Sequence, residues 1–259
     1  MGICGQSKLI NELYFEVVIP SEDVNKKIYF IDNSENFTEP ITKKKHNHDF
    51  LPEVNERNTQ LYINYKKTKF QKFFIPDQKG IYRFQLKFDI ELRDCSYMFY
   101  NCKNLLRVDF TKFKTNYLSD VKYMFYCCSN LIDINFTFFD TYRVTDMSFM
   151  FYFCIHLEKL DIGIFSTENV TNMKGMFSLC QRLPELNLSN FNTKNVRNME
   201  IMFEGCCNLK NLDLSSFNFD KVEEYSNIFD GCKFYSTFKL DKNFAKKIGE
   251  VNTFNTFYC

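Results

Sequence analysis

The chain has 259 residues, of which 45% are hydrophobic and 18% aromatic, and its 33 Lys and Arg nearly balance its 32 Asp and Glu. This composition excludes wholesale disorder, which requires low hydrophobicity and a large net charge. The formal net charge of +1 removes the global electrostatic reason to expect nucleic acid as a partner. No run of residues approaches the roughly 20 apolar residues of a membrane-spanning helix.

Residues 1–10 carry a possible lipidation signal. Gly2 and Cys4 follow the initial methionine without the apolar stretch of a secretory signal. This arrangement is typical of N-myristoylation with adjacent palmitoylation, where two acyl chains hold a protein that one chain binds only marginally. Gln6 replaces the usual Ser or Thr, so an ordinary disordered terminus is the alternative. We expect the chain to be cytoplasmic and do not expect secretion through a signal peptide. Acylation would place it at the inner face of a membrane.

Residues 11–91 alternate between apolar and polar side chains, which predicts a small β-rich domain. The expected strands are Leu13–Ile19, Lys27–Ile31, Gln60–Tyr65, Phe70–Ile75 and Ile81–Ile90. We expect this domain to cover the first repeat that follows, because the end of a repeat stack otherwise exposes its core. The polar loop between Asp32 and Thr59 contains His46, His48 and Asp49, whose side chains we expect to be solvated. No metal or cofactor is expected.

A strict 26-residue repeat organises residues 92–240. Its most visible column is Met98-Phe99, Met124-Phe125, Met150-Phe151, Met176-Phe177, Met202-Phe203 and Ile228-Phe229. Each unit reads M-F-x-x-C-x-x-L-x-x-L-x-L-x-x-F, in which the L-x-x-L-x-L part predicts a short strand that stacks on the next at about 4.8 Å. The Met-Phe segment has i, i+3, i+4 spacing and predicts an outer helical turn.

The repeat also contains a column of six cysteines, namely Cys102, Cys128, Cys154, Cys180, Cys206 and Cys232. A metal site needs clustered cysteines, and one thiol per repeat does not provide them. An in-register row also offers no reason to form a disulfide in one direction rather than the other. We therefore expect buried free thiols that pack as small hydrophobic groups.

Residues 169–177 (NVTNMKGMF) and 186–191 (LNLSNF) resemble the BspA-like leucine-rich repeats, also called the mycoplasma-type surface-protein repeat. The resemblance covers roughly Leu92 to Leu240. It implies a leucine-rich-repeat solenoid of α/β type, with short parallel strands and outer helical turns, and adhesion or protein-binding roles at bacterial or protist surfaces. The β-rich domain would precede this solenoid. A C-terminal cap at 241–259 would follow it, and the residues around Phe244 suggest a strand and an amphipathic turn.

Strand positions that point away from the core are the candidate binding residues on the concave surface. One column contains Arg107, Asp133, Lys159 and Glu185, and the next contains Asp109, Asn135, Asp161, Asn187 and Asp213. The charges alternate along the first column, and neighbouring like charges would repel. The columns therefore have two interpretations that can hold together: electrostatic neutrality of the stack, and a polar groove for a protein partner.

The leading functional hypothesis is a non-enzymatic protein-binding or scaffold module that uses the solenoid surface. A cell-surface adhesion protein of the BspA-like type is the alternative. The sequence contains no phosphate-binding glycine loop, no G-x-S-x-G and no H-E-x-x-H motif. Cys154 has a possible activating base in His156, but two residues this close on a coil belong to different faces, so we do not expect an enzyme.

Overall fold

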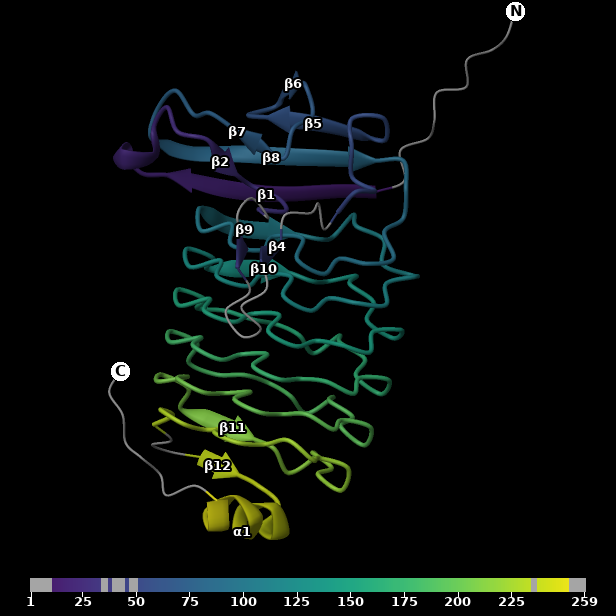
Figure 1. Ribbon diagram of the computed structural model, residues 1–259, viewed down its shortest axis with the longest axis vertical. Helices are drawn as coiled ribbons and strands as arrows, with labels where there is room; N and C mark the ends of the chain where they lie inside the picture. The colour runs from purple at the N-terminus through teal and green to yellow at the C-terminus, as the bar shows by residue number, and fades with distance from the viewer. Residues whose placement is uncertain (1–10, 34–36, 39–44, 47–50, 234–236, 252–259) are drawn as a thin grey trace, which may run out of the picture.

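The computed structural model describes residues 11–33, 37–38, 45–46, 51–233 and 237–251 (Figure 1). Gly2, Cys4, His48 and Asp49 lie outside the described residues. The elements are β1 (Asn11–Ile19), η1 (Ser21–Asp23), β2 (Ile28–Tyr29), β3 (Phe37–Thr38), β4 (Lys45–His46), β5 (Thr59–Ile63), β6 (Lys66–Thr68), β7 (Phe73–Phe74), β8 (Gly80–Phe88), β9 (Leu105–Asp109), β10 (Asp133–Asn135), β11 (Asn211–Asp213), β12 (Thr237–Lys239) and α1 (Lys242–Val251). Regular structure in these ranges is mostly strand.

The largest sheet has six strands in the order β10-β9-β1-β8-β5-β6. β1 pairs antiparallel with β8 over its full length. On its other side β1 pairs antiparallel with β9, the first strand of the repeats, and β9 pairs parallel with β10. One mixed sheet therefore continues from the N-terminal segment into the repeats. We call its antiparallel part, β1, β8, β5 and β6, the cap.

The cap follows from strict alternation of its side chains. Leu13, Phe15, Val17 and Ile19 of β1 are buried, and the residues between them are only partly so. Each of the five predicted strand segments overlaps a strand of the structure, with bounds that differ by one to three residues or enclose a shorter strand, so the existence of these strands is confirmed. β6 was missed because all three of its residues are exposed, which leaves no apolar alternation to detect.

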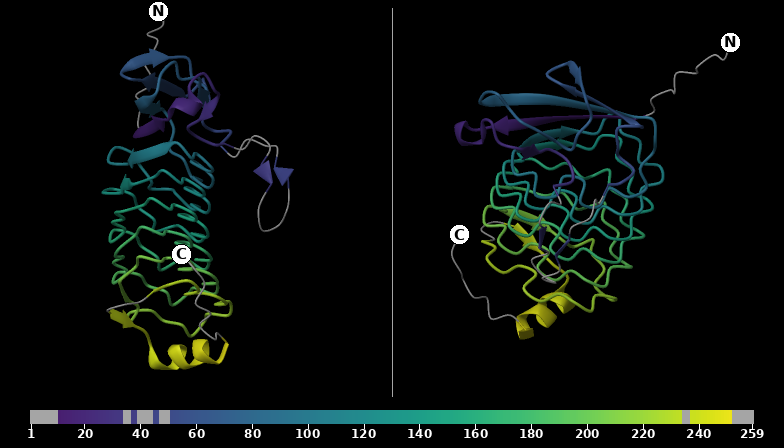
Figure 2. Two further views of the ribbon diagram at one scale, coloured as in Figure 1. Left: turned by 90° about the vertical axis from the view of Figure 1, so that its left-hand side faces the viewer. Right: turned by 45° about the horizontal axis from the view of Figure 1, so that its top comes forward.

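The repeats form coils that stack along the longest axis of the molecule (Figures 1 and 2). Parallel bridges join equivalent residues of successive coils, from Asp94 and Asp120 near the cap to Asn198 and Glu224 at the far end. We call this part the coil stack. Because equivalent residues lie side by side, each column of the sequence is also a column in space.

The Met-Phe segment does not form the predicted helical turn. Its backbone N–H groups alternate between two kinds of partner: Tyr97, Phe99 and Asn101 donate to carbonyls of the next coil, whereas Met98 and Tyr100 close tight turns within their own coil. Tyr97 and Asn101 also have φ of 61° and 53°, outside the helical region. Consecutive tight turns repeat apolar residues at the same spacing as a helix, so periodicity alone could not separate the two.

The same left-handed backbone conformation recurs at two equivalent places in each coil. At the first place the residues are Tyr97, Tyr123, Phe149, Gly175, Ile201 and Asn227, with φ between 50° and 61°. Gly adopts this conformation readily, whereas most other residues lose roughly 1–2 kcal/mol. Hydrogen bonds between coils therefore impose the conformation. A second constraint applies at Gly175: a Cβ there would lie 2.5 Å from the Phe149 ring, so a larger residue would clash with that ring.

Phenylalanine rings form a column in the core. Phe99, Phe125, Phe151, Phe177, Phe203 and Phe229 stack with neighbouring ring centroids 5.4–5.9 Å apart. Phe15 of β1 continues this packing, since its ring centroid lies 5.5 Å from that of Phe99. The cap and the coil stack therefore share one hydrophobic core.

The six column cysteines are unpaired thiols, as predicted. Five of them donate Sγ–H to a phenylalanine carbonyl 29 residues earlier; Cys154, for example, donates to the Phe125 carbonyl at 3.3 Å. Burial raises the pKa of the Cys154 thiol well above its ordinary value. These cysteines therefore serve as protonated packing groups.

A column of buried threonines was not predicted. It consists of Thr115, Thr141, Thr167 and Thr193. Thr167 Oγ1 accepts a hydrogen bond from the backbone N–H of Asn192 at 2.8 Å and lies 3.2 Å from the Asn192 carbonyl, to which it donates. Because these hydroxyls bond only to neighbouring coils, nothing in one repeat distinguishes them from exposed threonines.

α1 lies beyond the last coil (Figure 1). Asp241 accepts hydrogen bonds from the backbone N–H groups of Asn243 and Phe244, which caps the helix start. Phe244 and Ile248 are buried, and the Phe244 ring stacks on Phe219 with centroids 3.7 Å apart. The sequence predicted a strand and an amphipathic turn here. The structure has the strand β12 and, in place of the turn, a ten-residue helix.

Candidate functional site

The nine predicted partner-binding residues lie in two hollows of the polar sheet face, by which we mean the solvent side of the parallel strands and the cap. Arg107, Asp109, Asp133 and Asn135 line a hollow of about 380 Å³ at the cap. Lys159, Asp161, Glu185, Asn187 and Asp213 line a second hollow of about 680 Å³ farther along the stack. We call them the cap hollow and the distal hollow.

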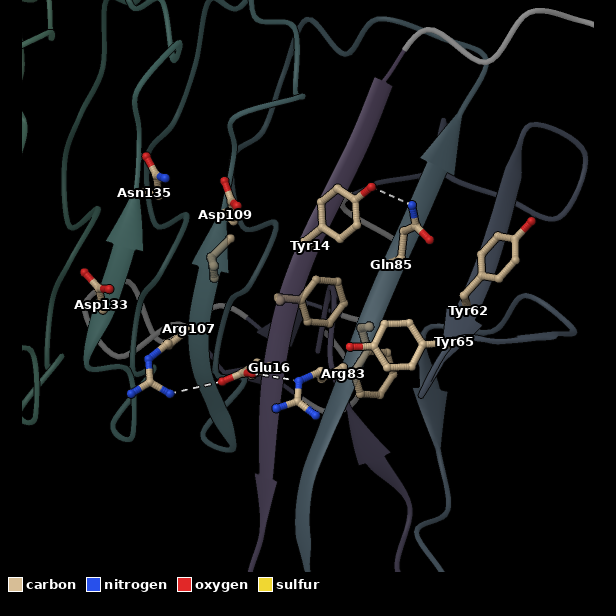
Figure 3. Close-up of a pocket in the computed structure, with 13 residues that line it drawn as sticks. Tyr14, Glu16, Tyr62, Tyr65, Arg83, Gln85, Arg107, Asp109, Asp133 and Asn135 are labelled. Atoms are coloured by element: carbon tan, nitrogen blue, oxygen red, sulfur yellow. Dashed lines mark hydrogen bonds and ion pairs between the residues drawn. The ribbon is translucent and has the colours of Figure 1, made fainter.

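An ion-paired row crosses the cap hollow (Figure 3). Glu16 of β1 pairs with Arg83 of β8 (Nε–Oε1 3.2 Å) and with Arg107 of β9 (Nη1–Oε2 3.0 Å). The register places Asp133 of β10 next to Arg107, and Asp133 makes no ion pair within the described part of the chain. Four adjacent strands thus present charges of alternating sign.

A second row in the cap hollow is aromatic and largely uncharged. Gln85 donates to the Tyr14 hydroxyl at 2.7 Å, and the Tyr14 hydroxyl in turn donates to the Glu12 carboxylate. This hydrogen bond from Tyr14, together with the nearby charges of Lys87 and Lys112, lowers the pKa of Glu12 against the opposing effect of burial. Tyr14 is therefore held in a fixed orientation at the floor of the hollow.

Half of the cap hollow comes from residues that sequence reasoning missed. They are Tyr14, Glu16, Tyr62, Tyr65, Arg83 and Gln85, all from the cap. The alternation of β1 and β8 shows that these side chains share a solvent face. It does not show that β1 pairs with β9, and this pairing is what brings them beside Arg107 and Asp109.

The distal hollow is more acidic. Its charged lining residues are Glu158, Lys159, Asp161, Glu185 and Asp213. Lys239 bonds to Asp213 at 2.8 Å and, as the largest cause, lowers the pKa of that carboxyl. Arg182 pairs with Glu158 at 3.5 Å. Partial pairing leaves the carboxylates of Asp161 and Glu185 facing solvent.

One predicted column also has a structural role. Asp109, Asn135, Asp161, Asn187 and Asp213 each accept a hydrogen bond through Oδ1 from the backbone N–H two residues later, at 2.8–3.1 Å. Such bonds stabilise the turn that ends each strand. Because Asn and Asp both supply Oδ1, the charge of the aspartates is not needed for this role.

The Cys154 and His156 side chains do not form a nucleophile and base pair. The Cys154 thiol donates to the Phe125 carbonyl, and His156 Nδ1 lies 2.6 Å from the Ser129 carbonyl. Within the described ranges, no group of three or more His, Cys, Asp or Glu is arranged to hold a metal ion. Among the same residues, no helix has the length and apolar content to cross a lipid bilayer.

No curated protein and no solved structure matches the chain. A family described as "Mycoplasma protein of unknown function, DUF285" matches residues 93–186 and, in an overlapping second match, residues 128–243. Together the two matches span the coil stack and more than half of the chain. The protein therefore belongs to the DUF285 family.

Proposed function

We propose that the coil stack is a leucine-rich-repeat solenoid of the BspA-like type, and that the chain is a non-enzymatic scaffold that binds a protein partner along the polar sheet face. The 26-residue period and the parallel bridges between coils support the solenoid assignment. Stacked repeats bury their apolar residues in one core and leave an extended surface for binding.

The observation that carries the binding proposal is the clustering of all nine predicted residues in the two hollows. The cap hollow adds Tyr14 and Tyr62 beside Arg83 and Arg107, and Tyr and Arg are enriched in protein interfaces. The ion pairs of Glu16 hold both guanidinium groups in place before a partner arrives, which lowers the entropy lost on binding.

The binding proposal is tested by changing Asp109, Asp161 and Asp213 together to Asn. Asn135 and Asn187 already make the same turn-ending hydrogen bond, so we expect the urea midpoint to stay nearly unchanged. We expect affinity capture to lose partners that wild type retains. The matched control changes Asp140, Asp220 and Asp241 to Asn, which removes the same charge outside both hollows. Equal capture by all three proteins would refute a role for this face.

We further propose that acylation at Gly2 and Cys4 tethers the scaffold to the cytoplasmic face of a membrane, since two acyl chains give stable anchoring. Membership of the DUF285 family favours the BspA-like alternative, an adhesion protein at the cell surface. Two measurements distinguish the tether from adhesion: membrane fractionation of the wild type and of Gly2→Ala, and surface biotinylation of intact cells. Biotinylation of the intact chain supports adhesion, whereas release of Gly2→Ala from membranes without biotinylation supports the tether.

A further inference from the structure

The free edge of the cap combines exposed apolar and basic side chains. Of the eight large hydrophobic side chains exposed in the described structure, three lie between the β5–β6 turn and the start of β8: Tyr65 (83% exposed), Ile75 and Ile81 (47%). Lys66, Lys67 and Lys69 are interleaved with them and are also exposed. Figure 1 shows β6, which contains the first two lysines, at the end of the molecule opposite α1.

Tyr65 adopts an unfavourable conformation for no internal gain. Asn64 and Tyr65 form the two-residue turn between β5 and β6, with φ of 48° and 66°. Such turns favour Asn followed by Gly, and a bulky residue at the second position loses roughly 1–2 kcal/mol. The Tyr65 side chain makes no hydrogen bond or ring contact with any residue that the structure describes. A ring kept exposed at this expense indicates a role outside the chain.

The turn is fixed against the neighbouring strand. The Asn64 backbone N–H donates to the Arg83 carbonyl at 2.8 Å, and the Arg83 backbone N–H donates to Asn64 Oδ1 at 2.9 Å. Ile81 lies two residues before Arg83 on β8, on the same face because side chains alternate. Tyr65 and Ile81 are therefore held at the same end of the cap sheet.

The lysines carry unneutralised charge. Lys66, Lys67 and Lys69 form no ion pair within the described ranges. Glu56 and Asp89 line a hollow with Lys67 and Lys69, and Arg57 in the same hollow leaves cations in excess. Lysines on an edge strand also prevent pairing with other chains. That role and binding to an anionic surface can hold together, because both use the same exposed positive charge.

We propose that this edge of the cap, formed by Tyr65, Lys66, Lys67, Lys69 and Ile81, docks onto an anionic lipid surface. Tyr is enriched at membrane–water interfaces, and lysines near an anionic leaflet each strengthen binding several-fold. The docked chain would stand with the coil stack, and with it the distal hollow, pointing away from the membrane. The proposal goes beyond the acyl tether and does not depend on it.

The test uses the full chain made in bacteria, where Gly2 carries no acyl group, so a failure of the tether cannot affect it. We expect co-sedimentation with vesicles of phosphatidylcholine and phosphatidylserine but not with phosphatidylcholine alone, and weakening as salt is added. Lys66→Glu, Lys67→Glu and Lys69→Glu together should weaken vesicle binding about a hundredfold or more. Glu keeps the edge charged, so protection of the edge is preserved.

The matched control changes Lys194, Lys221 and Lys242 to Glu, which alters net charge equally at the far end. It should bind vesicles much more tightly than the cap variant. Tyr65→Gly should weaken vesicle binding while the urea midpoint stays the same or rises, because the turn is relieved. Absent or lipid-independent binding, equal loss in both triple variants, or binding of an RNA oligonucleotide in place of vesicles would each overturn the proposal.

Discussion

In the cap, β1 and β8 pair over nine residues, and each cross-strand pair is different. In the coil stack, β10 and β11 have only three residues each, and successive coils are joined mainly by bonds between their outer turns. The cap thus depends on two long strands with one register. The stack depends on one set of contacts repeated in every coil, so its order comes from repetition rather than from strand length.

Raising the pH should destabilise the coil stack but not the cap through its thiols, because residues 11–91 contain no cysteine. This is the largest effect that we expect. Burial raises the pKa of Cys128, Cys154, Cys180 and Cys206 well above the ordinary value. Below about pH 8.5 both states keep these protons, and the stabilisation is complete. Above it the unfolded chain binds fewer protons, and each thiol lowers the free energy of unfolding by about 1.4 kcal/mol per pH unit.

These four thiols alone predict a loss of up to about 5 kcal/mol per pH unit, and the raised pKa values of Cys95, Cys102 and Cys232 add to it. Urea unfolding between roughly pH 8.5 and 9.5 measures the slope. Cys154→Ala should reduce this slope by about 1.4 kcal/mol per pH unit, even though the variant is less stable at neutral pH. A slope that does not change with this substitution would contradict the assignment of the buried thiols.

Interrupting the phenylalanine column should have the next largest effect. Phe151 is fully buried between Phe125 and Phe177, so Phe151→Ala should cost about 3–5 kcal/mol in urea unfolding. Phe138 belongs to the preceding coil but is 67% exposed, and Phe138→Ala should change stability by less than about 0.5 kcal/mol. Similar effects of the two changes would mean that the column does not carry the stack.

Removing an ion pair at the junction between the cap and the coil stack should have the smallest effect on stability. Glu16→Gln removes the carboxylate that pairs with Arg83 and Arg107. Because both arginines are about half exposed, we expect a loss of about 0.2–1 kcal/mol that shrinks in high salt. Glu223→Gln breaks the more exposed pair with Arg197 in the stack and serves as the control. A larger, salt-independent loss at Glu16 would show that side chains, rather than β1–β9 pairing, hold the junction.

The coil stack was predictable because its period is local and repeated. Columns such as Phe151 and Cys154 could be read directly from the sequence, and so could the exposed columns of Arg107 and Asp109. The Thr167 hydrogen bonds could not be read, because they join different coils. The cap hollow was predicted only in part, since the β1–β9 pairing joins segments some 90 residues apart and no repeated pattern records it.

The left-handed position on each outer turn has an evolutionary consequence. Five residue types (Tyr, Phe, Gly, Ile and Asn) occupy the position equivalent to Tyr97 with nearly the same φ, so the adjoining coil acts as the template and accepts different side chains. A duplicated or deleted unit of 26 residues would meet the same template on both sides. Gene duplication could therefore lengthen or shorten the polar sheet face in whole coils while the cap and α1 continue to close its ends.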